Sequence, residues 1–449
     1  MRKDIFSVQI SIVTARLKAN FEPTKWFKTG VSLSGTMSKS NFQGSATETY
    51  YANPFYTAAT MAPVYPYYAH NEDGSIIKEN GSDLYNLNNY TYLGGRNIIY
   101  EIKNDINEKN RNSVTGQVYG TFTFLNDFKA TVRGDLFNSN YNVKTFNNPV
   151  IGDGAANKGR LSKEFYGTRE YRFTQELTWA HDFDKHHVDA LLVHEAFKHS
   201  YNYDFLMKEQ MKVSGNTEMS NFNKMTSIDG YKREYTTESY LFRGRYSYNE
   251  KYFLDASFRR DGSSRFYKPW GNFWSLGSSW IISQEDFLKD QKWINNLKLR
   301  LSYGEVGNDA GVDYYAYQGL FRSDVNSGIG AYYKTQIPNK NLKWETSGSL
   351  DLALEGRLFD RFNFSFDFFN KTSRDLLFTV YNPLSAGATS WQGDGDDITG
   401  MSQYYSNIGS VRNRGLEVAL DVDAIRAKDW KWNLGVNFTL LNNKITKLP

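Results

Sequence analysis

The sequence contains no cysteine and no long apolar run, and each absence excludes a class of protein. Without cysteine the fold has neither disulfide bonds nor thiol chemistry. A membrane-spanning helix needs roughly 18 consecutive apolar residues, whereas polar residues interrupt every apolar stretch of this chain after a few positions. No transmembrane helix is therefore predicted.

A strong excess of one charge is also missing. The chain has 53 Lys and Arg against 49 Asp and Glu, spread along its length, and a formal net charge of +4. Proteins that bind nucleic acid gather basic residues into a patch or stripe. The charge balance gives no electrostatic basis for binding DNA or RNA, so no nucleic-acid partner is expected.

Aromatic residues, in contrast, are abundant. The chain has 32 Tyr, 31 Phe and 10 Trp, which together make up 16% of its residues, while its mean hydropathy is −0.61. A transmembrane β-barrel combines these properties, because each strand needs only one apolar face and the other face can be polar.

Apolar and polar residues alternate with a period of two, which is typical of strands with two different faces. The window 362–368 has phenylalanine at every even position and polar residues between them, and the window 430–440 alternates in a similar way. The window 6–12 also alternates, which favours a strand there over a signal peptide. Such windows span about 9 to 16 residues, longer than the five or six residues of most strands in soluble proteins.

Charged residues occupy the second face of several windows. Arg172 and Glu176 alternate with Phe173, Leu177 and Trp179. A charge that faces lipid near the middle of the bilayer costs about 2 to 4 kcal/mol. These charges are therefore predicted to line an aqueous interior.

Short and long connections alternate between the windows. The short joints lie near 22–24, 126–127, 182–185, 249–251, 283–295, 360–361 and 428–429. The segment Ser283 to Leu288 in the longest of these joints predicts a short capped helix. The long connections lie at about 39–112, 140–163, 205–230, 305–340 and 373–403. Outer-membrane barrels have short periplasmic turns and long extracellular loops, so the long connections are predicted to be extracellular.

The predicted fold is all-β, a transmembrane antiparallel up-and-down β-barrel. Seven short joints imply about fourteen strands. The predicted strands are 6–21, 26–37, 113–125, 128–139, 165–181, 186–200, 233–248, 252–261, 272–282, 296–305, 346–358, 362–374, 411–425 and 430–442.

Motifs for catalysis and for metal or cofactor binding are incomplete. Five of the six histidines lie within 181–199, but His194 and His199 are five positions apart, whereas a zinc-protease helix needs four. The run Asp394 to Asp397 lacks the spaced carboxylates and distal Glu of a calcium loop. The segment from Gly328 lacks the third glycine of a dinucleotide-binding loop. No catalytic residue, metal site or cofactor is predicted.

Aromatic residues in the long loops are the candidate ligand contacts. An exposed ring can stack on a sugar face or hold a peptide side chain while its polar tip stays in water. The alternative role of each ring is to pack loops together or to join an interfacial aromatic girdle. The candidate substrate-binding residues are Tyr65, Tyr67, Tyr68, Trp391, Tyr404 and Tyr405.

Six segments resemble the SusC/RagA family of TonB-dependent outer-membrane proteins of Bacteroidota. The clearest resemblance covers about residues 240–448, and the earlier half agrees in pattern more than in motif. The segments are Tyr252 to Phe266, Trp274 to Phe287, Leu299 to Asn308, Pro338 to Glu345, Phe369 to Leu377 and Asn407 to Glu417.

The resemblance implies energised uptake of an oligosaccharide or peptide across the bacterial outer membrane. A SusD-like surface lipoprotein would cap the barrel, and TonB with ExbB and ExbD would act through a plug domain. Residues 1–449 are expected to be a partial barrel, about fourteen of roughly 22 strands, without plug or TonB box. Unpaired sheet edges are costly in lipid, so the isolated chain is not expected to insert stably; a heat-modifiable barrel band from it alone would contradict this.

Two other functions remain open from the sequence. A passive porin-like channel would share the alternating strands and differ in lacking a plug. A secreted all-β adhesin would bury the 362–368 phenylalanine face against a second sheet.

Overall fold

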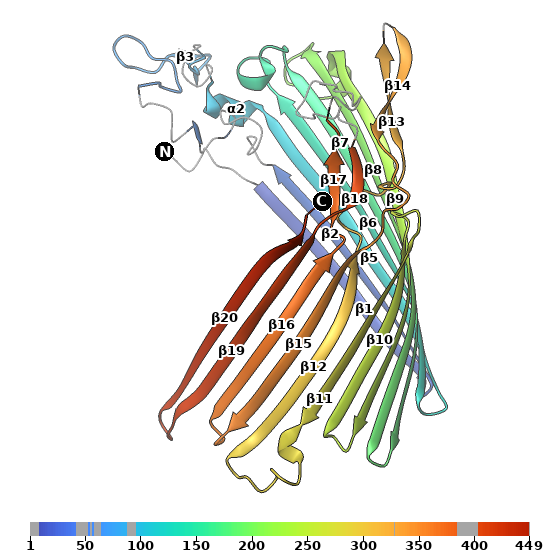
Figure 1. Ribbon diagram of the computed structural model, residues 1–449. Coiled ribbons are helices and arrows are strands. Elements are labelled where there is room, and N and C mark those ends of the chain that lie inside the picture. Colours follow the sequence, from blue (N-terminus) through green and yellow to red (C-terminus); the bar gives the residue numbers. More distant parts are fainter. Residues whose placement is uncertain are drawn as a thin grey trace.

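One antiparallel sheet of fourteen strands makes up most of the chain in the computed structural model (Figure 1). The structure describes residues 9–41, 53, 56–57, 64–87, 96–326, 328–383 and 403–448. The strands of the sheet are β1 (Gln9–Thr24), β2 (Phe27–Asn41), β5 (Ile106–Phe124), β6 (Phe128–Asn147), β7 (Arg160–Phe183), β8 (His186–Met211), β9 (Phe222–Tyr248), β10 (Tyr252–Ser263), β11 (Trp270–Ile281), β12 (Ile294–Asn308), β15 (Glu345–Leu358), β16 (Phe362–Arg374), β19 (Ser410–Arg426) and β20 (Lys431–Lys447).

The fourteen strands lie in the sheet in the order in which they occur in the chain. Short turns join them at one end, which is the lower end in Figure 1, and the long connections all lie at the other end. The sheet curls but does not close within the described residues, because β1 and β20 each have one neighbour. The predicted all-β architecture of an incomplete up-and-down barrel is therefore confirmed.

All fourteen predicted strands are present, and their ends at the short turns agree within a few residues. At the long connections the predicted strands were too short. The strand predicted at 186–200 continues to Met211, and the one predicted from 233 begins at Phe222. Beyond residue 200 the polar residues Asn202 and Asp204 lie on the face where β8 carries apolar residues such as Leu192 nearer the short turns, so the apolar pattern that predicted the strand stops there.

Two details at the short-turn end correct the sequence analysis. The first turn lies at residues 25–26, since β1 continues to Thr24 with a break in pairing between Phe21 and Thr24. The expected capped helix after β11 is a 3-10 helix, Ile282–Gln284, without a side-chain cap. The Glu285 carboxylate instead accepts hydrogen bonds from Tyr252 Oη at 2.6 Å and Trp280 Nε1 at 3.0 Å.

The long connections contain further elements where the sequence predicted only loops. The elements are β3 (Lys78–Glu79), β4 (Ser82–Asp83), α2 (Ile98–Asn104), β13 (Leu320–Asn326), β14 (Ile329–Gln336), β17 (Leu377–Tyr381), β18 (Gln403–Asn407) and the 3-10 helices Gly152–Gly154 and Met219–Asn221. Strands β13, β14, β18 and β17 form a separate sheet. None of the helices in the described part of the chain has the length and apolar character to span a bilayer.

The strand register gives the large sheet one apolar and one polar face. Residues that pair directly lie on the same face, and one such row is Phe122, Ala130, Leu177, Leu192, Phe242, Phe258 and Trp274. The side chains of this row stay uncovered, with Leu192 51% and Phe242 47% exposed. Phe366 and Phe368 are likewise 42% and 38% exposed. Within the described residues no second sheet covers the 362–368 face, in contrast to the arrangement expected of an adhesin.

The opposite face is polar and lies on the concave side of the sheet. Arg172 Nε lies 3.7 Å from Glu195 Oε2 on this face. Arg300 Nη2 of β12 reaches Asp367 Oδ1 of β16 at 3.3 Å across the intervening strand β15. Contact over an intervening strand is favoured where curvature brings side chains together, which places the charged rows inside the curl, as predicted.

Candidate ligand-binding surface

Strands β7, β8 and β9 continue well beyond the apolar rows. They have 24, 26 and 27 residues, whereas a strand crosses a bilayer with about 9 to 11. On their convex face the apolar rows give way to the paired row Asn112, Asn140, Gly167, Asn202 and Lys232. This polar row shows that the wall projects beyond the apolar band toward the long connections.

Four tyrosines line up on the concave face of this projecting wall. Tyr141, Tyr166, Tyr203 and Tyr231 pair successively across β6, β7, β8 and β9. Their ring centroids are 5.4, 5.0 and 5.2 Å apart along the series, which is the spacing expected of directly paired residues. We refer to these four residues as the tyrosine row.

Arginines lie over both ends of the tyrosine row. The Arg111 guanidinium is 4.7 Å from the centroid of Tyr141 and that of Arg233 is 4.5 Å from the centroid of Tyr231. Tyr231 is 40% exposed. The hydroxyls of Tyr141 and Tyr203 have no hydrogen-bond partner among the described residues. The row therefore offers rings and hydroxyls to the interior.

Small hydroxyl residues lie beside the tyrosine row, on the side toward the short turns. The adjacent paired row on the same face is Thr36, Ser113, Ser139, Thr168 and Tyr201. Charged pairs such as Arg172 with Glu195 lie two paired rows or more beyond it. The tyrosine row and this hydroxyl row thus lie between charged rows, since the next row toward the long connections contains Lys109, Glu164 and Asp229.

The segment 309–319, between β12 and β13, packs against this wall at β8 and β9. Tyr314 Oη lies 3.0 Å from His199 Nε2, and His199 Nδ1 lies 3.0 Å from Glu170 Oε1. Arg233 Nη1 is 3.4 Å from Asp313 Oδ2. Since β12 and β8 are separated by three strands in the sheet, the segment crosses the concave side near the mouth.

Arg265 holds this segment in place. Arg265 is 9% exposed. Its guanidinium lies 4.5 Å from the ring centroid of Tyr235 and 5.3 Å from that of Tyr314. Its Nη1 donates a hydrogen bond to the Asp309 carbonyl at 2.7 Å. Burial also raises the pKa of Tyr314. Desolvated cation–π contacts contribute about 2 kcal/mol, so this cluster fixes the position of the segment.

Arg265→Ala is expected to release the segment 309–319 from the wall. The change removes two ring contacts and a hydrogen bond to a backbone carbonyl, a loss of about 2 to 4 kcal/mol in local stability. Amide hydrogen exchange in 309–319 should rise steeply, while exchange in β5 and β6 stays unchanged. Arg265→Lys, which keeps the charge without the planar fork, should fall between. Unchanged exchange in the alanine variant would contradict the role of Arg265.

Two of the predicted loop contacts, Tyr67 and Tyr68, belong to a second aromatic cluster. Tyr67, Tyr68, Tyr85 and Tyr100 follow one another with ring centroids 4.5, 5.2 and 5.2 Å apart. Tyr67 is 52% exposed, whereas Tyr65 and Tyr68 are half-buried. Burial raises the pKa of Tyr68. Tyr67 keeps the most accessible ring of the three predicted contacts.

The other predicted contacts are less accessible or lie elsewhere. Tyr405 is 9% exposed and packs in a cluster with Phe266, Val312 and Leu342, so its ring holds loops together in this arrangement. Tyr404, its neighbour in β18, is half-buried. Trp391 and the acidic run Asp394 to Asp397 lie outside the described residues.

The tyrosine row was missed because its members lie on four different strands. Only the strand register brings them together, and a single sequence does not give that register. Three of them lie beyond the predicted strand ends: Tyr141 falls in the predicted long connection 140–163, and Tyr203 and Tyr231 lie just outside the predicted strands 186–200 and 233–248. The pair Tyr201 and Tyr203, two positions apart, was the available signal for an aromatic face on an extended strand.

The histidine-rich hairpin does not gather its histidines at one point. His181 Nδ1 lies 2.8 Å from Asp127, His187 Nδ1 lies 2.5 Å from Asp182, and His194 Nε2 lies 3.0 Å from Glu238. An odd spacing puts His194 and His199 on opposite faces of β8. Within the described part of the chain no three His, Asp or Glu residues are placed to hold a metal ion.

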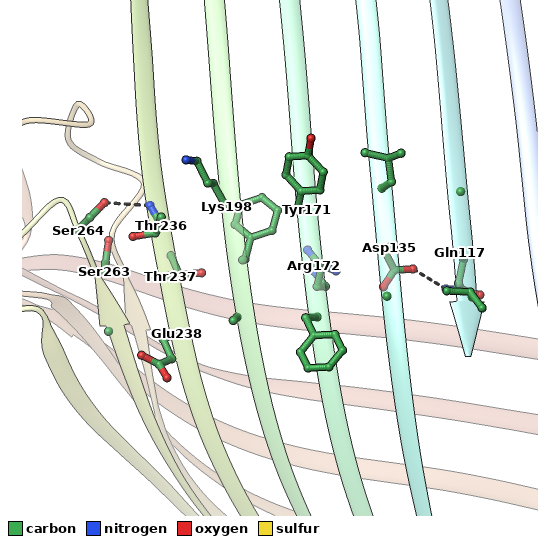
Figure 2. A pocket seen from close by; sticks show the side chains of 18 of the residues that line it. Gln117, Asp135, Tyr171, Arg172, Lys198, Thr236, Thr237, Glu238, Ser263 and Ser264 are labelled. Atoms are coloured by element: carbon green, nitrogen blue, oxygen red, sulfur yellow. Dashed lines mark hydrogen bonds between the residues drawn. The ribbon is translucent and has the colours of Figure 1, made fainter. Parts of the chain in front are cut away.

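A hollow of about 1130 Å³ runs across the opposite, convex face (Figure 2). Its floor is formed by small residues, Gly116, Gly134, Ala196 and Gly262, and Tyr171 and Lys198 lie beside it on adjacent strands. Because this face carries the uncovered apolar rows, the hollow lies where lipid is expected. It is therefore a poorer candidate for a water-soluble ligand than the tyrosine row.

Sequence comparisons agree with this geometry. The family model described as "TonB dependent receptor-like, beta-barrel" matches residues 25–448. TonB-dependent receptor P39 of Formosa agariphila is 29% identical over 97% of this chain, which spans 39% of that protein. TonB-dependent receptor SusC of Bacteroides thetaiotaomicron is 35% identical over 50% of this chain, which spans 22% of that protein.

Comparison with known structures shows the fold. The RagAB peptide transporter superposes with a TM-score of 0.78 at 20% identity, over 98% of this chain and 47% of that one. The ferric citrate transporter FecA superposes with a TM-score of 0.51 at 8% identity, over 98% of this chain and 52% of that one. The chain thus spans about half the length of these barrels and less of the curated relatives.

Proposed function

Because this chain belongs to the TonB-dependent receptor-like β-barrel family, whose members lie in the outer membrane of Gram-negative bacteria, we propose that it forms part of the wall of a nutrient importer. The cargo is an oligosaccharide or a peptide. The wall separates lipid on its convex face from water on its concave face, and the projecting rim provides the first contacts with ligand.

The observation that carries this proposal is the polarity of the two faces. Apolar rows such as that of Leu192 and Phe242 stay uncovered on one side, and ion pairs such as Arg300 with Glu355 and Asp367 line the other. Such a sheet is stable only between hydrocarbon and water. A water-lined wall conducts polar solutes and needs no bond-making group, so we assign it no catalytic step.

The proposed partners follow from the similarity to SusC and to RagAB. We infer that a SusD-like surface lipoprotein covers the rim and that TonB with ExbB and ExbD supplies energy through a plug domain. The name of RagAB describes a peptide transporter, which keeps peptide among the candidate cargoes beside oligosaccharide. The long connections, including those at about 39–112 and 305–340, are proposed to be extracellular and to contact the lipoprotein.

Uptake in cells distinguishes this function from its two rivals. Cells that lack the gene are expected to lose uptake of a fluorescent oligosaccharide or peptide that the parent strain imports, and TonB depletion should abolish the same uptake. A passive porin would keep uptake without TonB. An adhesin would leave uptake unchanged when the gene is deleted.

A further inference from the structure

We propose that the tyrosine row is a binding site for an uncharged oligosaccharide that lies across strands β6 to β9. This inference rests on the proposed function, because it selects one of the two cargo classes left open there. Its basis is the chemistry of the wall around Tyr141, Tyr166, Tyr203 and Tyr231.

The site is elongated and continuous. Four paired rings on neighbouring strands extend over three strand spacings, roughly 14 Å, with no gap wider than 5.4 Å between successive centroids. A short rigid solute would contact one or two rings. A chain molecule that lies along the row contacts all four.

The rings are placed for contact with a ligand and not for core packing. At the same end of the sheet, Phe146, Leu161 and Phe222 form a buried cluster, with exposures of 5%, 0% and 0%. Tyr231 is 40% exposed, and the other three tyrosines are partly exposed. Aromatic rings left open beside water bind sugar faces through their apolar surface while the hydroxyl stays hydrogen-bonded.

The hydrogen-bonding groups near the row suit hydroxyl-rich ligands. A phenol hydroxyl both donates and accepts, as do serine and threonine hydroxyls. Ser113, Ser139 and Thr168 lie in the paired row next to the tyrosines on the same face. Sugar hydroxyls also donate and accept, so each hydroxyl of a glycan can form a hydrogen bond with a hydroxyl of the wall in either direction.

Charged side chains flank the tyrosine row, and several of them have partners. Arg233 pairs with Asp313 at 3.4 Å, and Glu170 pairs with His199 at 3.0 Å. Arg111 stacks on Tyr141 at the outer end of the row.

Glu164, in the adjacent paired row toward the long connections, accepts a hydrogen bond from Tyr166 Oη. Its carboxylate can accept hydrogen bonds from sugar hydroxyls as well and repels acidic groups. The four rings bear no charge, so a ligand contacts them through apolar faces and hydroxyls, which favours a neutral glycan.

The assignment is tested with the purified full-length protein on an array of neutral and acidic glycans. Tryptic casein peptides serve as a third class of probe. Binding to at least one neutral glycan is expected, together with weak or absent binding to alginate, polygalacturonate and the peptides. The variant Tyr166→Ala with Tyr203→Ala should bind the neutral glycan roughly tenfold to hundredfold more weakly. Tyr166→Phe with Tyr203→Phe, which keeps the rings, should lose less.

Tyr171→Ala is the matched control, since Tyr171 lies on the convex face of β7 and is 48% exposed. It should leave glycan binding unchanged, and all variants should keep the heat-modifiable band of the parent. Failure of every neutral glycan to bind overturns the ligand class, and unchanged affinity in the double alanine variant overturns the site. Both results leave TonB-dependent uptake of another cargo intact, whereas loss of the proposed function appears as uptake that survives gene deletion.

Discussion

Leu192→Arg is expected to abolish assembly of the barrel in the membrane, whereas the same change at the adjacent Leu191 is tolerated. Leu192 is 51% exposed within an apolar row of the convex face. An arginine facing hydrocarbon there costs about 2 to 4 kcal/mol, a large part of the 5 to 15 kcal/mol that stabilises a typical protein. Leu191 pairs with Thr178 and Arg243 on the concave face, where water screens the new charge.

The measurement is made on the full-length protein and is the fraction that reaches the outer membrane and migrates as a folded, heat-modifiable band. Both variants carry an arginine on the same strand, so any general effect of arginine on β8 is the same in both and does not affect their difference. Loss of the band for Leu192→Arg and its retention for Leu191→Arg identifies the lipid-facing side directly. The reverse result would show that the two faces are assigned the wrong way round.

The second large effect is expected at Glu101, in the connection between β2 and β5. Arg96 and Glu101 are buried, with side chains 7% and 5% exposed, and Arg96 Nη2 lies 2.6 Å from Glu101 Oε2. Arg96 also lies 3.0 Å from Asp153, which belongs to the next long connection. Removal of one partner from a buried ion pair costs about 3 to 5 kcal/mol. Glu101→Ala should therefore separate α2 from the 148–159 segment.

Trypsin cleavage after Lys103 measures this separation. Cleavage should be much faster in Glu101→Ala than in the parent protein. In the double variant Arg96→Met with Glu101→Leu the rate should return toward that of the parent, because no buried charge is left without a partner. Equal cleavage rates in the single and double variants would contradict the explanation.

The pH dependence of the same cluster has a definite sign. Burial raises the pKa of the Glu101 carboxyl, against the opposing effect of Arg96. As the pH falls, Glu101 is therefore protonated at a higher pH in the folded protein than in the unfolded chain. Its contribution to the free energy of unfolding is largest at acid pH and declines as the pH rises through the raised pKa. Glu101→Gln should remove this dependence while still accepting a hydrogen bond from Arg96.

The sequence predicted the part of the fold that is in contact with lipid. Hydrocarbon on one side and water on the other require apolar and polar residues to alternate. Windows such as 362–368 therefore predict both the strand and which of its residues face lipid. The wall above the membrane has water on both sides and no such constraint. For this reason the ends of β8 and β9 and the small sheet of β13, β14, β17 and β18 were interpreted as loops.

The ligand surface was harder to predict than the fold. Loop position alone suggested Tyr405 as a contact, but its ring packs with Phe266 and Leu342. Side chains that meet on a wall come from distant positions, as Tyr141 and Tyr231 do, and only the pairing of every strand between them brings them into one row. A single sequence predicts which residues can line the interior but not which of them lie side by side.

The chain-order arrangement of the fourteen strands has a consequence for folding. Each strand pairs with the strands next to it in chain order, so no pairing waits for a strand from a distant part of the sheet. A hairpin closed by a turn of two or three residues forms first and offers its free edge to the next. The wall can thus grow hairpin by hairpin, with β1 and β20 at its two open edges.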